Sequence, residues 1–164
     1  MPHDLSIKPI AFVSAARTSP EDDFWGDSTA DITLVDSLDE EALVGIEAFS
    51  HVEVLFIFHR VEQTNVTTGA RHPRGNSVWP EVGIFAQRGK NRPNRIGSTI
   101  CRVVRVQGRT LTVAELDAID GTPVVDIKPV MREFLPRQEV TQPPWATELM
   151  EHYWSMGSGK KNGA

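Results

Sequence analysis

The sequence predicts a mainly β fold, an antiparallel β-barrel with short peripheral helices and a C-terminal helix. Most apolar segments are short, rich in β-branched and aromatic residues, and separated by turn-forming residues. No helical pattern lies between consecutive strand-like segments, which disfavours parallel βαβ units. The segments 99–106 and 110–116, joined by Gln107 and Gly108, form the clearest predicted hairpin. Short antiparallel strands of this kind are typical of a closed sheet.

The first half of the chain contains three predicted strands and one short helix. Ser37 and Glu40 match a capping box, in which both side chains satisfy free backbone donors at a helix start. The segment 52–58 is β-branched and aromatic, as in a strand buried on both faces. In order, the predicted elements are a strand at 7–16, an acidic surface loop at 21–31, a strand at 32–35, a helix through Leu43 and the strand at 52–58.

The second half begins with a long irregular segment, 62–80, of a length that is usually functional or mobile. A strand is predicted at 82–87, then the hairpin, then a turn at Asp120-Gly121 and a strand at 124–128. After two prolines, apolar residues recur at helical spacing over 145–154. We expect one barrel domain over residues 1–156 and a flexible tail over 157–164.

Charge is distributed unevenly along the chain. The net charge is −5, with 40% hydrophobic and 24% charged residues, as in an ordinary globular protein. Residues 1–62 contain 13 acids and three bases, whereas residues 71–109 contain nine bases and one acid. Within the second region, the loop at 83–97 is rich in Arg and Lys and contains no acid. It suits an anion or a carboxylate, and solvated arginines are the alternative.

Several classes of protein are disfavoured by what the sequence lacks. It has no stretch long enough to span a bilayer and no secretory signal, and its single cysteine, Cys101, fits a reducing cytoplasm and a small buried side chain. Dinucleotide and nucleoside triphosphate cradles, zinc spacing and the hydrolase elbow are also missing. We therefore expect a cytoplasmic protein with no metal and no membrane contact.

Polar residues gather where predicted strands end, which is how folds usually build sites. His59 and Arg60 end one strand, and Asp117 and Asp120 flank a turn. Each has a structural alternative. His59 could bond a loop backbone, and Asp120 could simply form its turn. Asp126 and Lys128 share a strand face and could form an ion pair, which needs no ligand.

Several motifs together resemble the TsaA-like (YaeB/TrmO) family. The most specific are Arg-Pro-Asn-Arg-Ile-Gly at 92–97 and Asp-Gly-Thr-Pro-Val-Val-Asp-Ile-Lys-Pro at 120–129. Supporting motifs lie at 46–51, 54–59 and 83–88, in the family's order. The resemblance implies a β-barrel that binds S-adenosyl-L-methionine, usually as a homodimer with the cofactor near the subunit interface. It also implies methylation of N6 of threonylcarbamoyladenosine beside the tRNA anticodon.

The resemblance also assigns residues. Those it implies as cofactor contacts are His59, Arg60, Arg88, Ser98, Glu115, Leu116 and Asp117. Arg92, Asn94, Thr122 and Lys128 are implied near the site, with Arg92, Asn94 and Lys128 expected to bind substrate. A methionine carboxylate suits Arg88 or Arg60. Methyl transfer needs mainly alignment, and Asp120 or His59 is the candidate catalytic base. The alternative function is a module that binds S-adenosyl-L-methionine or RNA, or a methyltransferase with a different substrate.

The sequence departs from the family pattern in three places. Arg95 replaces a proline, which we expect to loosen the loop, and Val130 stands where a tyrosine often follows Lys-Pro. A basic segment after Pro20 is replaced by the acidic Phe24-Trp-Gly-Asp27. That last change affects the loop from which the resemblance implies N-terminal cofactor contacts, and it bears on the identity of the substrate.

Overall fold

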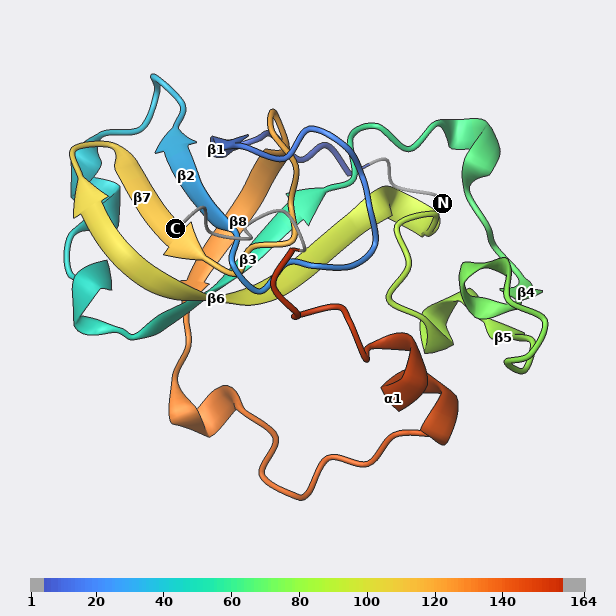
Figure 1. The fold of residues 1–164 in the computed structure, drawn as a ribbon. Coiled ribbons are helices and arrows are strands. Elements are labelled where there is room, and N and C mark those ends of the chain that lie inside the picture. Colours follow the sequence, from blue (N-terminus) through green and yellow to red (C-terminus); the bar gives the residue numbers. More distant parts are fainter. Residues whose placement is uncertain (1–4, 158–164) are drawn as a thin grey trace, which may run out of the picture.

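The chain forms a closed antiparallel barrel with a small two-stranded ladder beside it (Figure 1). A computed structural model describes residues 5–157. The barrel order is β1-β2-β7-β6-β3-β8, and every pairing in it is antiparallel. Its strands are β1 (Ala11–Ala15), β2 (Thr29–Leu34), β3 (His51–Ile57), β6 (Ile96–Gln107), β7 (Thr110–Ala114) and β8 (Pro123–Pro129). The predicted fold class is therefore confirmed.

The interior of the barrel is filled by one face of each strand. Alternate residues point inward, so β3 buries Val52, Val54 and Phe56 almost completely while the residues between them stay partly exposed. The prediction that this strand is buried on both faces was wrong, because antiparallel barrel strands need only one apolar face. The remaining core comes from the facing strands and includes Val13, Ile32, Leu111, Val113 and Val124.

The predicted hairpin is confirmed, and β6 extends further at both ends. It runs for 12 residues, and its pairing with β7 shifts register between Val103 and Arg105. Gly108 turns the chain with a φ of 57°, a left-handed conformation that glycine adopts without strain. At the other end, β6 pairs with the whole of β3. This long strand therefore links the hairpin to the loop at 83–97.

Residues 58–95 form a lobe outside the barrel, at the right of Figure 1. It contains β4 (Ala70–Arg71), β5 (Val82–Gly83) and four one-turn 3-10 segments, Gln63–Asn65, Pro73–Gly75, Ile84–Ala86 and Pro93–Arg95. The strand predicted at 82–87 was wrong beyond its second residue. The buried Gln87 amide donates to the carbonyl oxygens of Arg71 and Val82, at 3.0 and 2.9 Å, which stabilises a turn instead.

Other boundaries also differ from the prediction. The 3-10 segment Glu40–Leu43 begins after Asp39 with no side-chain cap, so the capping box predicted from Ser37 is not formed. Two further 3-10 segments span Ile46–Ala48 and Arg132–Phe134. The acidic segment is a loop only to Ser28, since β2 already starts at Thr29, and Trp25 within it is 3% exposed.

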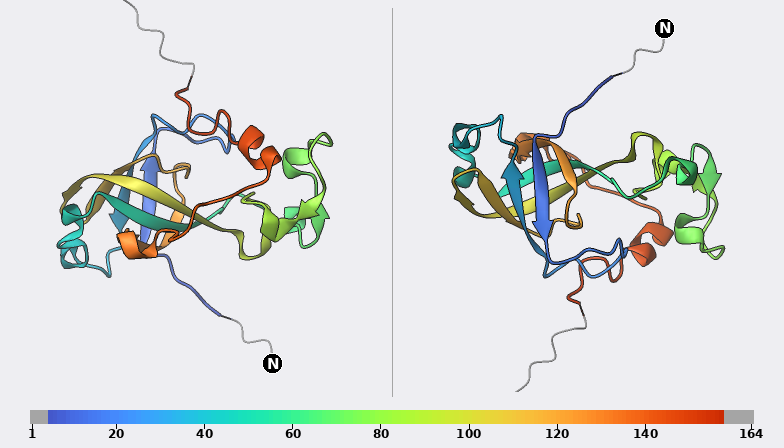
Figure 2. Two further views of the ribbon diagram at one scale, coloured as in Figure 1. Left: turned by 90° about the horizontal axis from the view of Figure 1, so that it is seen from below. Right: turned by 90° about the horizontal axis from the view of Figure 1, so that it is seen from above.

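The C-terminal helix is shorter than predicted. α1 covers Pro144–Leu149, and the following residues form turns that lie against the N-terminal loop. Both views in Figure 2 place α1 beside the β4–β5 lobe, where Trp79 Nε1 donates to Glu148 Oε2 at 2.8 Å. Residues 158–164 of the predicted tail lie outside the described residues. Within residues 5–157, no helix has the length and apolar character needed to cross a membrane.

Gly97 is the tightest point of the β3–β6 contact. A Cβ at this position would lie 2.6 Å from the Phe56 ring, which is 1% exposed. We expect Gly97→Ala to lower the free energy of unfolding by about 1–3 kcal/mol, because the core must shift to admit the methyl group. Urea denaturation measures this, with Gly69→Ala as the control, since a Cβ there meets nothing within 4 Å. Equal stabilities of the two variants would contradict this packing.

Candidate functional site

The two candidate catalytic residues lie together. His59 follows β3 and lies against the Asp120–Gly121 turn, where a Cβ on Gly121 would be 3.8 Å from His59 Nε2. Burial is the main cause that lowers the pKa of His59 below 6.5, and the nearby Arg60 charge adds to it. The carboxylate of Asp120 and a backbone contact at Ile57 act in the opposite direction. The imidazole is therefore mainly neutral near pH 7 and can accept a proton.

Asp120 also holds its own turn in place. Its Oδ1 accepts a hydrogen bond from the Ala15 backbone N–H at 3.1 Å, and its own N–H donates to Arg17 O at 2.8 Å. Beside it, Arg60 donates to Thr18 O at 2.8 Å. The structural role expected for an Asp-Gly pair is thus present. The contacts leave the second carboxylate oxygen, Oδ2, for other partners.

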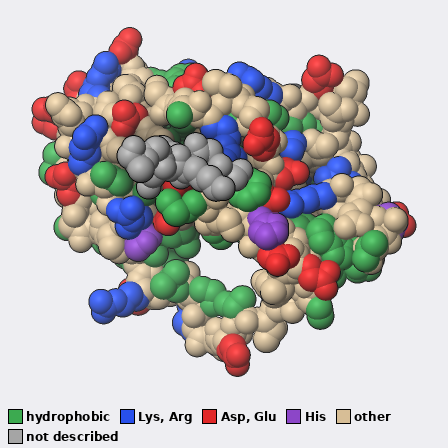
Figure 3. Space-filling view, viewed as in Figure 1, with side chains coloured by type: hydrophobic (Ala, Val, Ile, Leu, Met, Phe, Trp, Pro, Cys, Tyr) green, Lys and Arg blue, Asp and Glu red, His purple; other side chains and the backbone are tan. Residues whose placement is uncertain are grey.

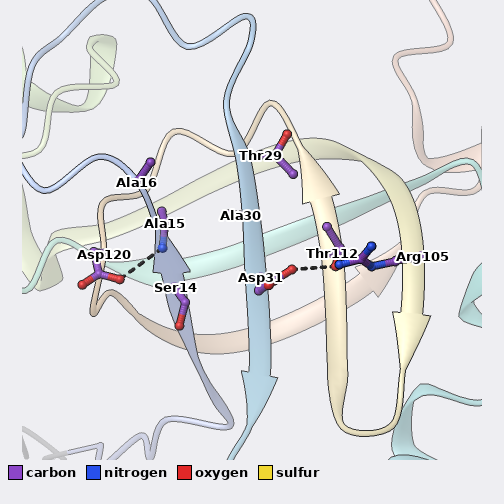
Figure 4. A pocket seen from close by; sticks show the side chains of 9 residues that line it. All are labelled: Ser14, Ala15, Ala16, Thr29, Ala30, Asp31, Arg105, Thr112 and Asp120. Atoms are coloured by element: carbon purple, nitrogen blue, oxygen red, sulfur yellow. Dashed lines mark hydrogen bonds between the residues drawn. The ribbon is translucent and has the colours of Figure 1, made fainter.

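Asp120 borders a shallow hollow of about 420 Å³ on the outer face of the β1–β2–β7–β6 sheet. Figure 4 shows small side chains at its floor and the Asp31–Thr112 hydrogen bond, 2.6 Å, beside Arg105. The hollow is open and polar. Asp120 therefore borders this hollow and also lies close to His59.

A second group of predicted residues surrounds Asp117. Arg88 Nη2 donates to the backbone oxygen of Ser98 at 2.5 Å. Thr99 Oγ1 donates to Asp117 Oδ1, and Tyr153 O–H donates to Asp117 Oδ2. Sequence reasoning missed Thr99 and Tyr153. The alternation of β6 is a signal for Thr99, because the residue after an outward-facing Ser98 points inward, whereas Tyr153 carried no signal beyond helical spacing.

The negative charge of Asp117 affects the pKa values of two neighbouring groups, the Cys101 thiol and the Tyr153 hydroxyl. Burial, followed by the charges of Asp117 and Glu115, raises the pKa of Cys101. Burial and the Asp117 carboxylate also raise the pKa of Tyr153, while the Arg88 charge acts in the opposite direction. Cys101 is therefore an inert buried thiol, as predicted. The two carboxylates, the tyrosine and the guanidinium lie in one neighbourhood.

Glu115 and Leu116 form the turn out of β7. Glu115 has a φ of 67° and its N–H donates to Ser28 O at 2.8 Å. Leu116 is 1% exposed and belongs to the core, so its side chain is not available to a ligand. Only its backbone can contact one, and its carbonyl oxygen lies 3.4 Å from the Ser28 hydroxyl.

Positively charged side chains of the 83–97 loop form hydrogen bonds and ion pairs with other groups of the chain. Arg92 donates to Gln87 O at 2.8 Å and Lys90 pairs with Asp22 at 3.1 Å. Arg74, from the same lobe, pairs with Asp23 at 2.8 Å. The acidic loop therefore neutralises part of the basic patch. Arg92 acts first as a brace of its own loop.

Arg95 strengthens the loop that it was expected to loosen. Its guanidinium donates to Val61 O at 2.6 Å, and its carbonyl oxygen accepts the Phe58 N–H at 2.8 Å. Asn94 and Arg95 both have positive φ, 61° and 52°. A proline ring holds φ near −65°, so a proline cannot occupy position 95 in this conformation. The expectation was wrong because the side chain supplies a tertiary contact.

Ser98 and Lys128 lie on the opposite face of the strands from Thr99. The Ser98 hydroxyl donates to Glu53 Oε1 at 2.6 Å, and Lys128 forms an ion pair with Asp126. Lys128 and Glu53 border an apolar hollow on the outside of β3, β6 and β8. The structure thus places His59, Arg60 and Arg88 near Asp117 or Asp120, whereas the side chains of Ser98, Lys128 and Arg92 have other partners. Among residues 5–157, no cluster of three or more His, Cys, Asp or Glu has metal-site geometry.

Comparison with known proteins identifies the family of this chain. The family model described as the tRNA-methyltransferase O N-terminal domain matches residues 12–134. The chain belongs to this family. The tRNA-methyltransferase O domain so defined includes the barrel apart from Ala11, the first residue of β1, together with every predicted site residue, and it ends before α1.

Three relatives illustrate the similarity. A human tRNA (adenine(37)-N6)-methyltransferase is 38% identical over 104 residues, which are 63% of this chain and 23% of that protein. A probable S-adenosyl-L-methionine-binding protein from Pyrococcus abyssi is 32% identical over 85% of this chain and 76% of its own length. A crystal structure of TrmO from Pseudomonas aeruginosa superimposes with a TM-score of 0.65 at 28% identity, covering 88% of this chain and 66% of that one.

Position 95 gives a test of the loop conformation. Arg95→Pro should lower the free energy of unfolding by about 2 kcal/mol, because the ring is incompatible with a φ of 52°. Arg95→Gly keeps that conformation available and removes only the side-chain contact, so it should be less damaging. Thermal and urea denaturation of both variants measures the difference. A proline variant as stable as the glycine variant would contradict the loop conformation.

Proposed function

We propose that this protein is an S-adenosyl-L-methionine-dependent methyltransferase that modifies N6 of threonylcarbamoyladenosine beside the tRNA anticodon. The supporting observation is that a chain of the tRNA-methyltransferase O family brings His59 to Asp120 and Arg88 to the Asp117 group. Relatives from human and Escherichia coli carry the name tRNA (adenine(37)-N6)-methyltransferase. The matched region of this chain covers 23% and 40% of those two proteins, and their activity is therefore proposed for this chain.

The residues present fit the chemical groups of this cofactor. An amino-acid carboxylate suits the Arg88 guanidinium, which keeps donors beyond the one given to Ser98. The ribose hydroxyls and the positive sulfur suit the carboxylates of Asp117 and Glu115. Backbone groups beside Leu116 are placed to contact an adenine edge. When bound, the cofactor supplies a methyl group on a positively charged sulfur.

The chain's own contribution to the reaction is alignment and one proton transfer. The N6 nitrogen must lose its proton when it is methylated, and the neutral imidazole of His59 can accept it. Asp120 orients the turn beside His59 and is the second candidate acceptor. Since the site holds rigid strand ends, positioning of donor and acceptor accounts for most of the proposed rate enhancement.

The proposed tRNA contacts follow from position. Arg92 and Asn94 lie in the loop that precedes β6, and the hollow beside Asp120 is open to a large substrate. Lys128 lies on the outer β3–β6–β8 face with exposed Ile100 and Phe134. We propose a homodimer that packs this face of one protomer against the same face of its partner. Sedimentation of the chain and of Ile100→Asp tests this, and two monomeric samples would refute it.

A second candidate is a module that binds S-adenosyl-L-methionine without catalysis. The Pyrococcus abyssi relative, which this chain matches over most of both lengths, is named only for binding. Lys90 and Arg92 also bond to groups of the chain itself, so fewer positive charges remain to bind RNA. The two functions differ in whether a methyl group leaves the cofactor.

Cofactor binding is tested by calorimetric titration with S-adenosyl-L-methionine. Arg88→Ala should weaken binding by about 10- to 100-fold, as expected for loss of a charge-assisted hydrogen bond of about 1.5–3 kcal/mol. Arg109→Ala is the matched control, because Arg109 pairs with Asp36 at the far end of the hairpin. No heat and no thermal shift with the unaltered chain would refute the proposed function, and equal losses in both variants would refute the placement of the carboxylate.

Transfer of a labelled methyl group to tRNA separates the two functions. The rate should fall as the pH drops below 6.5, because the pKa of His59 is lowered and its proton-accepting form is lost only there. His59→Gln should reduce the rate by about 10²-fold and remove this pH dependence. If cofactor binds and no label reaches threonylcarbamoyladenosine-containing tRNA, the proposed reaction is refuted, and the protein is a binding module or a methyltransferase with a different substrate.

A further inference from the structure

The last described residues, 150–157, reach the site although they lie outside the family match at 12–134. We call residues 150–157 the C-terminal clasp. The exposed arm 135–143, which runs apart from the barrel in Figure 1, leads through α1 to the clasp. Figure 3 shows an opening between this arm and the rest of the protein. The arm makes little contact, so the clasp must be held by its own interactions.

Backbone hydrogen bonds attach the clasp to the acidic N-terminal loop. Three successive N–H groups of the loop donate to clasp carbonyls, Phe24 to His152 at 3.1 Å, Trp25 to Tyr153 at 2.8 Å and Gly26 to Ser155 at 3.3 Å. A Cβ on Gly26 would lie 1.9 Å from the Trp154 carbonyl oxygen. The glycine therefore permits an approach that any side chain would prevent. The loop that departs from the family pattern is the one that receives the clasp.

Tyr153 joins the clasp to Asp117 and the residues around it. Its hydroxyl donates to Asp117 Oδ2, while Thr99 donates to Oδ1 from the other side. Each carboxylate oxygen has two lone-pair positions, so one position on each remains for a ligand. The Arg88 charge also acts on the Tyr153 hydroxyl, which places cation, carboxylate and phenol together. A carboxylate held at both oxygens has a defined orientation.

We propose that the C-terminal clasp is a wall of the S-adenosyl-L-methionine site and that Tyr153 is a positioning residue, which orients Asp117 toward the hydroxyls of a ribose. The proposal rests on the proposed function, because the ligand is the same. It assigns a role to a segment that the family domain does not contain. It also explains how the acidic loop can lie beside the site although it lacks the family's basic segment. The clasp covers this loop and forms the wall of the site in its place.

Tyr153→Phe tests the positioning role. The ring and the clasp remain, and only the hydroxyl is lost, so the dissociation constant for S-adenosyl-L-methionine should rise about tenfold. Thr99→Val should raise it by a similar factor, because it frees the same carboxylate from the other side. Glu148→Ala is the control. It removes the contact of α1 with Trp79, at 2.8 Å, and leaves Asp117 untouched, so binding should stay within about twofold.

Gly26→Ala tests the wall itself. The added methyl group clashes with the Trp154 carbonyl, which should detach the clasp and speed cofactor dissociation by about tenfold or more in stopped-flow displacement. Because Gly26 has no positive φ, the barrel should fold normally, and circular dichroism checks this.

The chain contains one tyrosine, so tyrosine labelled with ¹³C only at Cζ gives a single NMR signal, that of Tyr153. That signal should shift on addition of S-adenosyl-L-methionine and stay in place in Arg88→Ala at the same concentration. If the unaltered chain binds the cofactor, an unmoved signal and an unchanged dissociation constant in Tyr153→Phe would overturn the clasp proposal alone. Failure of the unaltered chain to bind would overturn the proposed function together with it.

Discussion

The pairing of β3 with β6 is the constraint on which the site depends. Its register runs without interruption from His51–Arg102 to Ile57–Ile96, and it decides which β6 side chains point inward. Thr99 consequently faces Asp117, and Ser98 faces the outside. A slip of one residue would exchange the two faces. The same pairing brings the end of β3, with His59, beside the loop that starts β6.

In the basic loop at 83–97, most positively charged side chains already have partners within the protein and are not available to a ligand. Its sequence alone suits an anion, yet Lys90 is neutralised by Asp22, and the guanidinium groups of Arg92 and Arg95 donate to backbone carbonyls. A loop with so few regular backbone hydrogen bonds needs side-chain donors to satisfy its carbonyl groups. Arg88 also gives one donor to the backbone, and its position beside Tyr153 and Asp117 keeps the rest near the candidate site. The loop is thus a braced support with one cation placed for a ligand.

The acidic loop and the C-terminal clasp hold each other in place through main-chain hydrogen bonds. Trp25 is buried, and the Arg17 guanidinium lies 3.7 Å from the centre of its ring while donating to Asp23 O and Phe24 O. The clasp adds main-chain pairing on the other side. A segment outside the matched domain therefore shapes the surroundings of residues inside it.

The sequence by itself determined the barrel class, the hairpin and the family, because alternation, turn residues and motif order are local properties. It also indicated that His59, Arg88, Asp117 and Asp120 belong to one region. Only the tertiary structure decided that Tyr153 reaches Asp117, that Lys90 pairs with Asp22, and that residues 84–86 turn instead of extending the strand. These contacts join residues far apart in the chain, or depend on a buried amide such as that of Gln87, and their geometry follows from strand register and packing, which no local pattern encodes.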